Sequence, residues 1–227
     1  MTVGGQVNAA IVSTGDEVVT LGSKLDRGQI YDSNSTLLQA LVQHCGAFVK
    51  SAEHCPDQRE RLIQAIQRGI ESHILVITGG VSVGEHDLVQ AALRTLGAKI
   101  DIWRVAIKPG KPFLFGEVGG CAVFGLPGNP VSAFVTFLQF VRPAILKMMG
   151  ANNLDLPKRS ARLTVDLANE GDRPHYVRGR IENRNFVPIG RQESHALFGL
   201  SQSNALLRVA VGQSLKASAI VDVQTWD

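Results

Sequence analysis

The stretch Ile74–Asp87, ILVITGGVSVGEHD, decides how this chain folds. It opens with a short apolar run rich in β-branched side chains, and paired glycines follow soon after. This is the pattern of a strand buried on both faces of a parallel sheet. Apolar residues then recur at helical spacing between Leu88 and Leu96, so we expect a helix to begin near Asp87. A strand, a glycine-rich turn and a helix N-terminus form an anion site, because unpaired N–H groups and the helix dipole point at one spot.

The loop inside this stretch carries groups that suit an anion and groups that do not. Its small residues, which let a backbone approach a ligand, include Gly79, Gly80, Ser82 and Gly84. Glu85 and Asp87 would repel a phosphate unless a divalent cation bridges them. An ordinary βα turn capped by Asp87 is the alternative interpretation. Glu85 also occupies the place of the P-loop lysine, and the dinucleotide glycine spacing is absent, so neither an ATP-type nor an NAD-type loop is expected.

Composition indicates a globular protein rather than a specialised surface binder. The 227 residues suffice for one sizeable domain or for a main domain with a small second one. Basic and acidic residues are interspersed and the net charge is +3, so we expect no nucleic-acid partner. We find no signal peptide, no membrane-spanning run and no zinc-ligand spacing among the six histidines. Three cysteines without a C-x-x-C pair predict free thiols in a reducing compartment, so we expect a cytoplasmic protein.

The first half of the chain alternates strands and helices. Strands are expected at Ala9–Ser13, at Phe48–Val49 and in the stretch quoted above. One helix has Ser33 or Asn34 as its expected N-cap, and a second opens at Pro56–Asp57. The β-α-β-α-β-α order predicts right-handed crossovers and a parallel sheet that is covered on both faces.

The second half begins with further strands and ends in a different pattern. A strand is expected over 100–107, a hairpin around Gly119–Gly120, and a long helix after Pro130 that bends or splits at Pro143. A linker over 150–157 leads to short strands expected at 161–167, 176–181, 186–189, 206–209 and 215–223. The predicted fold class is therefore α/β: a three-layer domain with a mostly parallel sheet over residues 1–150, followed by a small all-β domain over residues 151–227.

Four loops should meet at one edge of the predicted sheet, because ligands bind outside the carboxyl ends of strands in open α/β sheets. These loops are Thr14–Glu17, Thr78–Asp87, Lys108–Lys111 and Pro127–Asn129. Glu17 and Asp87 would then hold Mg²⁺, a hard cation that takes oxygen ligands and often shares them with phosphate. Lys108 and Lys111 would hold an oxyanion. Taken singly, each loop also fits an ordinary turn with exposed charges.

Five motifs in this order resemble one protein family. They are Ser13–Glu17, Gly28–Asn34, Thr78–Asp87, Ile107–Pro112 and Gly125–Ser132. They are similar to those of the MoeA-type molybdopterin molybdenumtransferases, the bacterial counterparts of the gephyrin E domain. The likeness covers residues 8–150. The tail, with Arg178–Arg180 and Gln192–His195, resembles the C-terminal β domain of that family more loosely.

This resemblance implies a fold, a reaction and a set of site residues. The fold is a MogA/MoeA-like molybdopterin-binding α/β domain followed by a β domain. The reaction is the insertion of molybdate into adenylylated molybdopterin during molybdenum cofactor biosynthesis, with Mg²⁺, by a homodimer that also meets the molybdopterin adenylyltransferase. The implied catalytic acids are Glu17, Asp57 and Asp87, of which Glu17 and Asp87 would hold the Mg²⁺.

The resemblance also implies residues that contact the two substrates. Those for the pterin and its phosphate are Thr14, Gly15, Asp16, Asp32, Asn34, Gly79, Gly80, Ser82, Gly84, Glu85, Gly110, Pro127, Gly128 and Asn129. Those for molybdate are Lys108, Lys111, Arg178 and Ser194.

Two departures from the family pattern concern individual residues. An Asp-Asp-Pro-like stretch is usual before the second helix, whereas this chain has His54–Asp57, so Asp57 is the candidate for that acid. Glu193 and His195 flank Ser194 where small residues are usual.

A third departure leaves other functions open. Family members carry two further domains ahead of the strand at Ala9, so the alternative is a module that binds molybdopterin without turnover. A MogA-type adenylyltransferase or a CinA-type enzyme would share the same α/β domain. The motifs at Lys108–Pro112 and Gly125–Pro130, together with the β tail, disfavour both.

Overall fold

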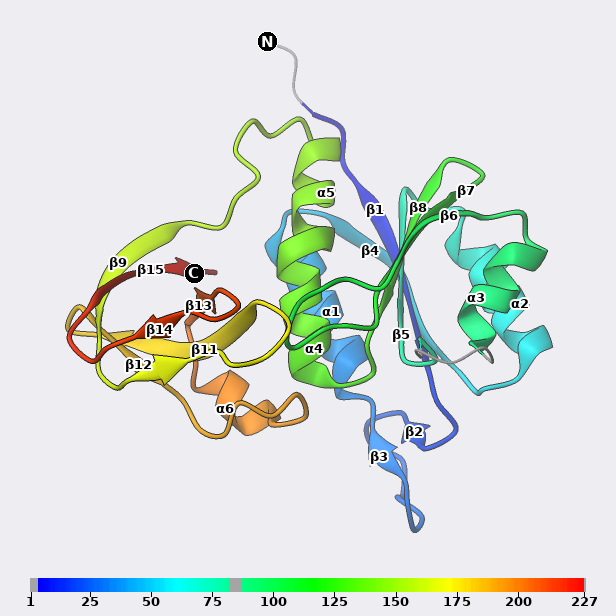
Figure 1. The fold of residues 1–227 in the computed structure, drawn as a ribbon. Coiled ribbons are helices and arrows are strands. Elements are labelled where there is room, and N and C mark those ends of the chain that lie inside the picture. The colour runs from blue at the N-terminus through cyan, green and yellow to red at the C-terminus, as the bar shows by residue number, and fades with distance from the viewer. Residues whose placement is uncertain (1–3, 82–86, 227) are drawn as a thin grey trace.

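The protein consists of an α/β sheet structure and a closed β-barrel, and the computed structural model describes residues 4–81 and 87–226 (Figure 1). Within that part of the chain the main sheet has the strand order β4-β1-β5-β8-β7-β6. The bounds are β1 Asn8–Thr14, β4 Phe48–Cys55, β5 Ile74–Thr78, β6 Lys99–Trp103, β7 Leu114–Val118 and β8 Cys121–Leu126. Strands β4, β1, β5 and β8 pair in parallel, and β7 runs antiparallel to both its neighbours. The predicted mostly parallel sheet is confirmed.

Helices cover both faces of this sheet, as Figure 1 shows. On one face lie α1 Ser33–His44, α4 Pro130–Thr136, a π-helical segment Phe137–Val141 and α5 Arg142–Met148; on the other lie α2 Arg59–Gly69 and α3 Leu88–Thr95. Successive residues of β1 alternate between two cores. Ala9 and Ile11 belong to the cluster with the α1 and α4 side chains, whereas Ala10 and Val12 belong to the cluster with those of α2 and α3. Strands apolar on both faces therefore fit a sheet between two helical layers.

The N-terminus of α1 differs from its prediction. Its N-cap is Asp32, whose carboxylate accepts a hydrogen bond from the backbone N–H of Ser35 at 2.8 Å. The predicted caps, Ser33 and Asn34, both lie inside the helix. Three consecutive residues here can cap a helix, and the sequence does not say which of them turns its side chain back onto the backbone. The structure uses the aspartate, whose negative charge also favours this end of the helix dipole.

The start of α2 differs from its prediction, whereas the start of α3 agrees with it. Helix α2 begins at Arg59 rather than at Pro56–Asp57, because the carboxylate of Asp57 bonds to Thr14 at the end of β1. Helix α3 follows Asp87 as predicted, and this carboxylate accepts a hydrogen bond from the N–H of Gln90 at 2.7 Å. The organising stretch therefore does end in a capped helix.

Some strand bounds were also predicted wrongly. Strand β4 continues from Phe48 to Cys55, because it pairs with β1 along the whole length of β1. Strand β6 ends at Trp103 instead of residue 107, and Arg104 with φ 73° turns the chain out of the sheet. The hairpin at Gly119–Gly120 is confirmed as the turn between β7 and β8.

The long helix after Pro130 changes geometry just before Pro143. Pro143 has no N–H to give to the preceding turn, and its ring would clash there in a regular α-helix. The π-helical segment that ends at Val141 widens the helix immediately ahead of it, and Pro143 then falls in the first turn of α5. The helix thus keeps its direction through a local irregularity.

The barrel is closed by strands in the order β11-β12-β9-β15-β13. Their bounds are β9 Lys158–Leu163, β11 His175–Glu182, β12 Asn185–Pro188, β13 Ala205–Val209 and β15 Ile220–Thr225, with α6 at Leu197–Ser201 between β12 and β13. The segments 161–167 and 215–223 were predicted as single strands. Each instead spans part of the barrel and part of a small antiparallel pair, β10 Leu167–Ala168 and β14 Ser214–Leu215.

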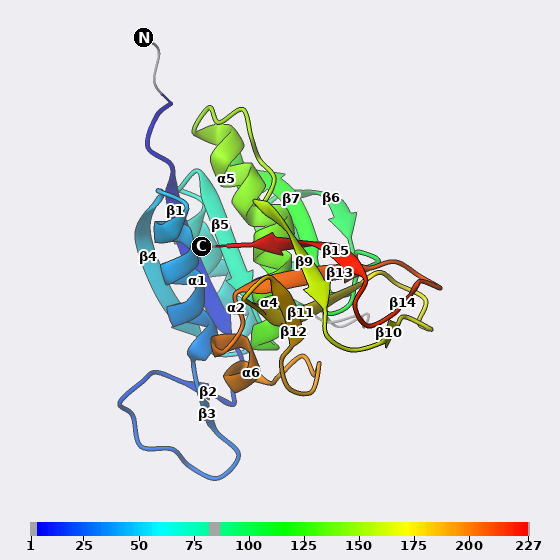
Figure 2. The same cartoon turned by 90° about the vertical axis from the view of Figure 1, so that its left-hand side faces the viewer.

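The barrel lies on the side of the sheet that carries α1, α4 and α5, where Figure 2 shows β13 and β15 in front of these helices. The end of β15 reaches back to the helical layer: the ring of Trp226 meets that of Phe134 edge-on, with 4.9 Å between centroids. His44 of α1 also lies within hydrogen-bonding distance, 3.1 Å, of the Trp226 carbonyl. The division of the chain into domains at residue 150 remains a prediction.

Within the described residues one helical stretch, Pro130–Met148, has the length and apolar composition that a membrane span needs. The sequence prediction that no such run exists was therefore wrong. More than half of this stretch is buried inside the protein, where its side chains join the core between the sheet and the barrel. A core helix meets the same test of length and composition.

Candidate functional site

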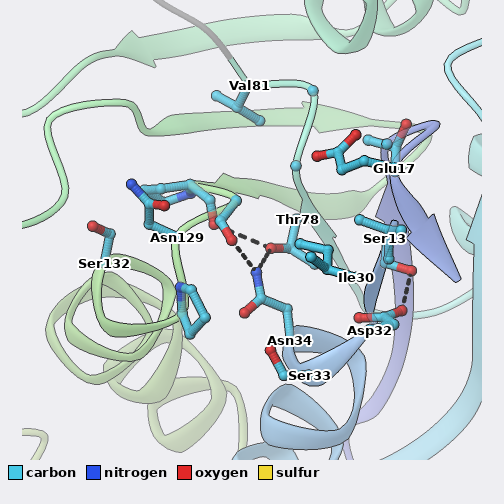
Figure 3. Close-up of a pocket in the computed structure, with 18 of the residues that line it drawn as sticks. Ser13, Glu17, Ile30, Asp32, Ser33, Asn34, Thr78, Val81, Asn129 and Ser132 are labelled. Atoms are coloured by element: carbon cyan, nitrogen blue, oxygen red, sulfur yellow. Dashed lines mark hydrogen bonds between the residues drawn. The ribbon is translucent and has the colours of Figure 1, made fainter. Parts of the chain in front are cut away.

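A cavity of about 530 Å³ lies at the carboxyl ends of β1, β5 and β8 and at the starts of α1 and α4 (Figure 3). Strand register brings these ends together, since Ser13 of β1 pairs with Thr78 of β5, and Thr78 pairs with Leu126 of β8. Parallel strands that end in register deliver the loops behind them to one edge of the sheet. The short pair β2 Val18–Val19 and β3 Ile30–Tyr31 adds a further wall.

Asn34 ties three of the surrounding segments together. Its amide nitrogen donates to Thr78 Oγ1 at 2.9 Å and to the Gly128 carbonyl at 2.7 Å. A carbonyl can only accept, so Gly128 fixes which end of the carboxamide faces it. The other end, Oδ1 of Asn34, is buried, and no donor from the described residues reaches it. Figure 3 shows this oxygen turned away from both hydrogen bonds, so it is an acceptor that no described residue uses.

Asp32 is a buried acid with a partner on each oxygen. Besides the Ser35 N–H, it accepts a hydrogen bond from the Ser13 hydroxyl at 2.5 Å. Ser13 Oγ also lies 3.3 Å from Nδ1 of His54. Since Ser13 gives its single proton to Asp32, a hydrogen bond at this distance would need Nδ1 of His54 to be the donor. Asp32 therefore fixes the end of β1 against the start of α1.

The other acids of this edge differ in how they are held. Asp57 accepts a short hydrogen bond from the Thr14 hydroxyl, and its backbone N–H donates to the carboxylate of Asp16 at 3.0 Å. These bonds join the loop after β1 to the loop after β4. Glu17 is exposed and lines the cavity, and Figure 3 shows its carboxylate at the rim. Of these acids, Glu17 is the one best placed to meet a ligand or a cation.

Glycines let the strand ends approach each other closely. Gly79 has φ 83°, and a Cβ atom there would lie 2.1 Å from the Thr14 carbonyl oxygen. A Cβ on Gly80 would lie 2.8 Å from Cγ2 of Thr14. Gly128 packs against Gly79 in turn, with 3.6 Å from its would-be Cβ to the Gly79 Cα. Gly79 therefore excludes a side chain because backbone fills the space, and Gly80 because methyl groups do, whereas the contact at Gly128 is an ordinary van der Waals one.

The loop with Lys108 and Lys111 is attached to the barrel. Lys108 forms a parallel bridge with His175: its N–H donates to the Pro174 carbonyl at 2.9 Å, and its carbonyl accepts from the N–H of Tyr176 at 2.7 Å. Both lysine side chains are exposed, and neither lines the cavity. The same loop reaches the cavity only through Pro112, the residue after Lys111.

Basic groups of the barrel gather where it meets this loop. Arg173 donates from its guanidinium to the Ile107 carbonyl at 3.0 Å. Burial, together with the positive charges of Lys108 and Arg178, lowers the pKa of His175 to about 4. His175 is thus neutral at physiological pH, and the charge of this junction comes from arginine and lysine side chains.

Arg178 is buried inside the barrel, with only 2% of its surface exposed. Its guanidinium donates to the Glu193 carbonyl at 3.0 Å and, through a shorter contact, to the Arg191 carbonyl. Burial lowers the pKa of this guanidinium, and the nearby charge of Glu193 partly opposes that effect. Arg178 therefore supports the loop that ends in Ser194 and does not line the cavity.

Ser194 joins that loop to the start of α4. Its carbonyl accepts from the N–H of Val131 at 3.1 Å, and its hydroxyl accepts from the amide of Asn129 at 2.9 Å. The next residue, His195, lines the cavity, with its ring 3.4 Å from the carboxylate of Glu193. The barrel thus contributes one wall to a cavity otherwise built by the sheet.

Residues 10–147 match a family of domains described as "Probable molybdopterin binding domain", and residues 160–226 match the family "MoeA C-terminal region (domain IV)". The chain belongs to the molybdopterin-binding domain family. The expected resemblance to MoeA-type proteins and the expected fold are confirmed.

Individual proteins give the same result. The chain is 36% identical to a molybdopterin molybdenumtransferase of Haemophilus influenzae over 89% of its own length and 52% of that protein. It is 37% identical to one of Nostoc sp. over 92% of its length and 50% of that protein. A crystal structure of a molybdopterin biosynthesis MoeA protein from Pyrococcus horikoshii superimposes with a TM-score of 0.87 at 28% identity, covering 98% of this chain and 55% of the other. The chain spans about half the length of the curated relatives it matches.

In this member of the molybdopterin-binding family, many of the predicted site residues do come together. Those that line the cavity are Thr14, Gly15, Glu17, Asp32, Asn34, Asp57, Gly79, Gly80, Pro127, Gly128 and Asn129. Those described but not among its lining are Asp16, Asp87, Lys108, Gly110, Lys111, Arg178 and Ser194. Ser82, Gly84 and Glu85 lie outside the described residues. The role of each residue towards a ligand stays a prediction.

Three of the predicted residues away from the cavity have local structural partners. Asp87 is 4% exposed and caps α3. A Cβ on Gly110 would lie 2.6 Å from Cγ2 of Thr136, so this glycine lets the lysine loop pack on α4. Asp16 holds the backbone of Asp57.

Several residues of the site were not named as site residues from the sequence, among them Ser13, Tyr31, Ser33, Thr78, Ser132 and His195 of the cavity lining, and Arg173 beside the lysine loop. Ser13 lines the cavity and bonds to Asp32; it opens the Ser13–Glu17 motif but was not named as a site residue. Arg173 meets the lysine loop from the barrel, and it lies just outside the more loosely matched Arg178–Arg180 motif. No local signal in the sequence distinguishes Arg173.

The residues can be tested for their fit to Mg²⁺. No group of three or more His, Cys, Asp or Glu side chains converges within residues 4–81 and 87–226. Mg²⁺ commonly takes one or two protein carboxylates and completes its shell with water and substrate phosphate. Glu17 fits that donor set, since its carboxylate is exposed at the cavity.

Proposed function

We propose that this chain binds adenylylated molybdopterin in the cavity at the ends of β1, β5 and β8, and that it serves the insertion of molybdate into that ligand during molybdenum cofactor biosynthesis. The observation that carries the proposal is the position of the cavity. It lies almost wholly within residues 10–147, which match the molybdopterin-binding domain, and at the sheet edge where open α/β folds bind ligands. The similarity to the transferases from Haemophilus influenzae and Nostoc sp. supports the choice of reaction.

Asn34 supports recognition of the pterin ring. A pterin carries N–H donors on its edge, and Oδ1 of Asn34 is a buried acceptor without a donor from the described residues. Leaving such a group unpaired costs about 1–3 kcal/mol, so a ligand donor that reaches it gains that amount. Its amide end is held by Thr78 and Gly128, which fixes the carboxamide in the orientation that presents an acceptor.

Glu17 is the residue that we propose for Mg²⁺, with Asp57 and Asp87 as the further acids of the site. When bound, the ion would neutralise phosphate charge and polarise the bond to the leaving phosphate. Glu17 is exposed, whereas Asp57 and Asp87 already accept hydrogen bonds from Thr14 and Gln90. Asp87 would therefore act mainly by holding the start of α3, and Asp57 by holding the loop after β1.

Molybdate would meet the lysine loop beside the cavity. It is a compact dianion, and the ammonium groups of Lys108 and Lys111 are exposed point charges suited to it. Arg173, whose guanidinium lies against the backbone of Ile107, is the barrel residue that adds positive charge at this junction. We propose Arg173 for this role in place of Arg178, because Arg178 is buried on the carbonyls of its own loop.

Assembly and location are proposed on the family resemblance alone. We infer a homodimer in the cytoplasm that receives its adenylylated ligand from the molybdopterin adenylyltransferase. All three cysteines of the chain are free, which is compatible with a reducing compartment.

Calorimetric titration with molybdopterin, with and without Mg²⁺, tests the proposal. Wild type should bind, and Mg²⁺ should tighten binding. Glu17→Gln keeps the size of the side chain and should abolish the Mg²⁺ effect. Glu60→Gln, at an exposed position of α2, should leave the Mg²⁺ effect intact. Absence of measurable binding would remove the proposed function.

Single-turnover insertion of molybdate separates catalysis from binding. Formation of the molybdenum-loaded product by this chain supports the transferase function. Binding without insertion would assign the chain the role of a molybdopterin-binding module.

A further inference from the structure

The loop 189–195 connects the interior of the barrel with the wall of the cavity. At one end, the backbone carbonyl of Arg178 accepts from the N–H of Ile189 at 3.2 Å. At the other end, Ser194 bonds to the first turn of α4 and His195 lines the cavity. Between these ends, within the described residues, the loop contains no helix or strand that would hold its shape.

Arg178 supports this loop from inside the barrel. Its guanidinium bonds to the carbonyls of Arg191 and Glu193, two residues apart along the loop. The side chain of Gln192 reaches in the opposite direction, accepting from the N–H of Arg178 at 2.9 Å and donating to its carbonyl at 3.0 Å. Residues 191, 192 and 193 are thereby all fastened to one residue of β11.

The chemistry of an arginine suits this task. A guanidinium is planar and rigid, so it holds two carbonyls at fixed positions, which an ammonium on a flexible stem cannot do. Burying the charge is costly, and no carboxylate lies within ion-pair distance of Arg178 in the described residues. Its Nε has no acceptor from those residues, because it faces Gly199 of α6, where a Cβ would lie 3.1 Å away. The fixed position that Arg178 gives to the loop offsets the cost of burying its charge.

We propose that Arg178 is a positioning residue: it sets the loop 189–195 so that Ser194 anchors the start of α4 and His195 forms the barrel wall of the cavity. The inference rests on the proposed function only in taking the cavity to be the molybdopterin site. It makes Arg178 act through other residues, without contact to molybdate or pterin. Ligand affinity then depends on a residue buried in the other part of the chain.

Hydrogen exchange measured by NMR on the free protein tests the connection directly. The Val131 amide bonds to Ser194, so its exchange reports on the far end of the loop. Arg178→Ala should raise the Val131 exchange rate about tenfold or more, since the anchor of that bond is lost. The amide of Leu207, which pairs with Val177 inside the barrel, should stay within about twofold of wild type.

Three further variants make the result specific. Arg178→Lys keeps the charge but not the two-carbonyl geometry, so it should resemble Arg178→Ala at Val131. Arg180→Ala removes an exposed arginine of the same strand, which is paired with Glu182, and should leave Val131 unchanged. Gln192→Ala removes the bonds from the loop to the backbone of Arg178. A raised Leu207 exchange rate would show that Arg178→Ala disturbs the barrel, and Gln192→Ala then serves as the test variant.

Molybdopterin binding provides the second readout. Arg178→Ala should weaken binding about fivefold, and the effects of Arg178→Ala and His195→Ala should not add in the double variant, because one acts through the other. Additive losses, or a Val131 rate equal to wild type in folded Arg178→Ala and Gln192→Ala, would overturn the inference. If wild type binds no molybdopterin, the proposed function fails, and the exchange rates still decide whether Arg178 positions the loop.

Discussion

At the ends of β1 and β5, side chains bond to side chains, whereas at the junction with the barrel, contacts to backbone predominate. In the first region Ser13 bonds to Asp32, and Asn34 bonds to Thr78. In the second, Lys108 meets the barrel through its backbone N–H and carbonyl, and its ammonium stays exposed. The comparison indicates that the sheet edge is a rigid holder in which most of these polar groups are bonded to one another, Oδ1 of Asn34 and the Glu17 carboxylate excepted. At the junction, the ammonium groups of Lys108 and Lys111 stay exposed to solvent.

The close approach of β1 and β5 should be the most sensitive feature of the rigid region. Gly79→Ala is expected to destabilise the protein by about 3 kcal/mol or more, because the new Cβ meets the Thr14 carbonyl and the backbone has positive φ. Gly97→Ala is the matched control, with φ 78° and open space around it, and should cost about 1 kcal/mol. Urea unfolding of both variants measures the difference. Equal losses would show that φ alone matters and that the strand ends are not tightly packed.

Within the rigid region, two acids of the cavity contrast a buried, hydrogen-bonded carboxylate with an exposed one. Asp32→Ala removes the cap of α1 and the partner of the buried Ser13 hydroxyl, so we expect a loss of about 2 kcal/mol. Glu17→Gln should change the stability by less than about 0.5 kcal/mol, because Glu17 is exposed. Thermal and urea unfolding at pH 7 measure both variants. A large loss in Glu17→Gln would mean that this carboxylate is structural too.

The sequence was informative about the rigid region for a physical reason. Buried strands and the glycines behind them are dictated by local sequence, so the position of β5 and the start of α3 could be predicted from Ile74–Asp87. The choice among Asp32, Ser33 and Asn34 as the cap could not be predicted. That choice depends on Thr78 and Gly128, which are distant in sequence and engage the side chain of Asn34.

The junction was harder to predict because it depends on the packing of two parts of the chain. Nothing local distinguishes Arg173 from Arg178, two arginines five positions apart at the start of the same strand region. Only the packing decides that Arg173 meets the lysine loop while Arg178 turns inside the barrel. Family motifs locate such residues approximately, and the contacts then assign them.

Acid should weaken the junction through His175. This imidazole has a pKa of about 4 in the folded protein, against 6.5 ordinarily, because it is buried beside Lys108 and Arg178. Between these two pH values the unfolded chain binds a proton that the folded one does not. Stability therefore falls as pH drops from about 6.5 towards 4, by up to about 1.4 kcal/mol per pH unit from this group.

His175→Gln removes the titrating group and tests this expectation. The difference in unfolding free energy between pH 7 and pH 5 should be smaller in the variant than in wild type. His195→Gln, an exposed imidazole on the same barrel, serves as the control and should keep the wild-type difference. An unchanged pH dependence in His175→Gln would show that other groups govern the acid response.

The lysines should show the smallest effect on stability and the most selective effect on ligands. Lys108→Gln and Lys111→Gln keep most of the side-chain length and remove the charge. Both side chains are exposed, so the unfolding free energy should change by no more than about 0.5 kcal/mol. Lys158→Gln, an exposed lysine at the far end of β9, is the control for a general change in net charge.

Their effect should appear in the use of molybdate rather than in the binding of molybdopterin. The cavity takes its contacts from the sheet edge, and neither lysine lines it, so the pterin affinity should be close to wild type. The variants should need a higher molybdate concentration than wild type for half-maximal insertion. Raising the ionic strength should increase this concentration more for wild type than for the variants, because salt screens exposed charges. Titrations with each substrate at two salt concentrations make the measurement. An equal loss for both substrates would place these lysines on the pterin phosphate, and the two regions would then act as a single anion site.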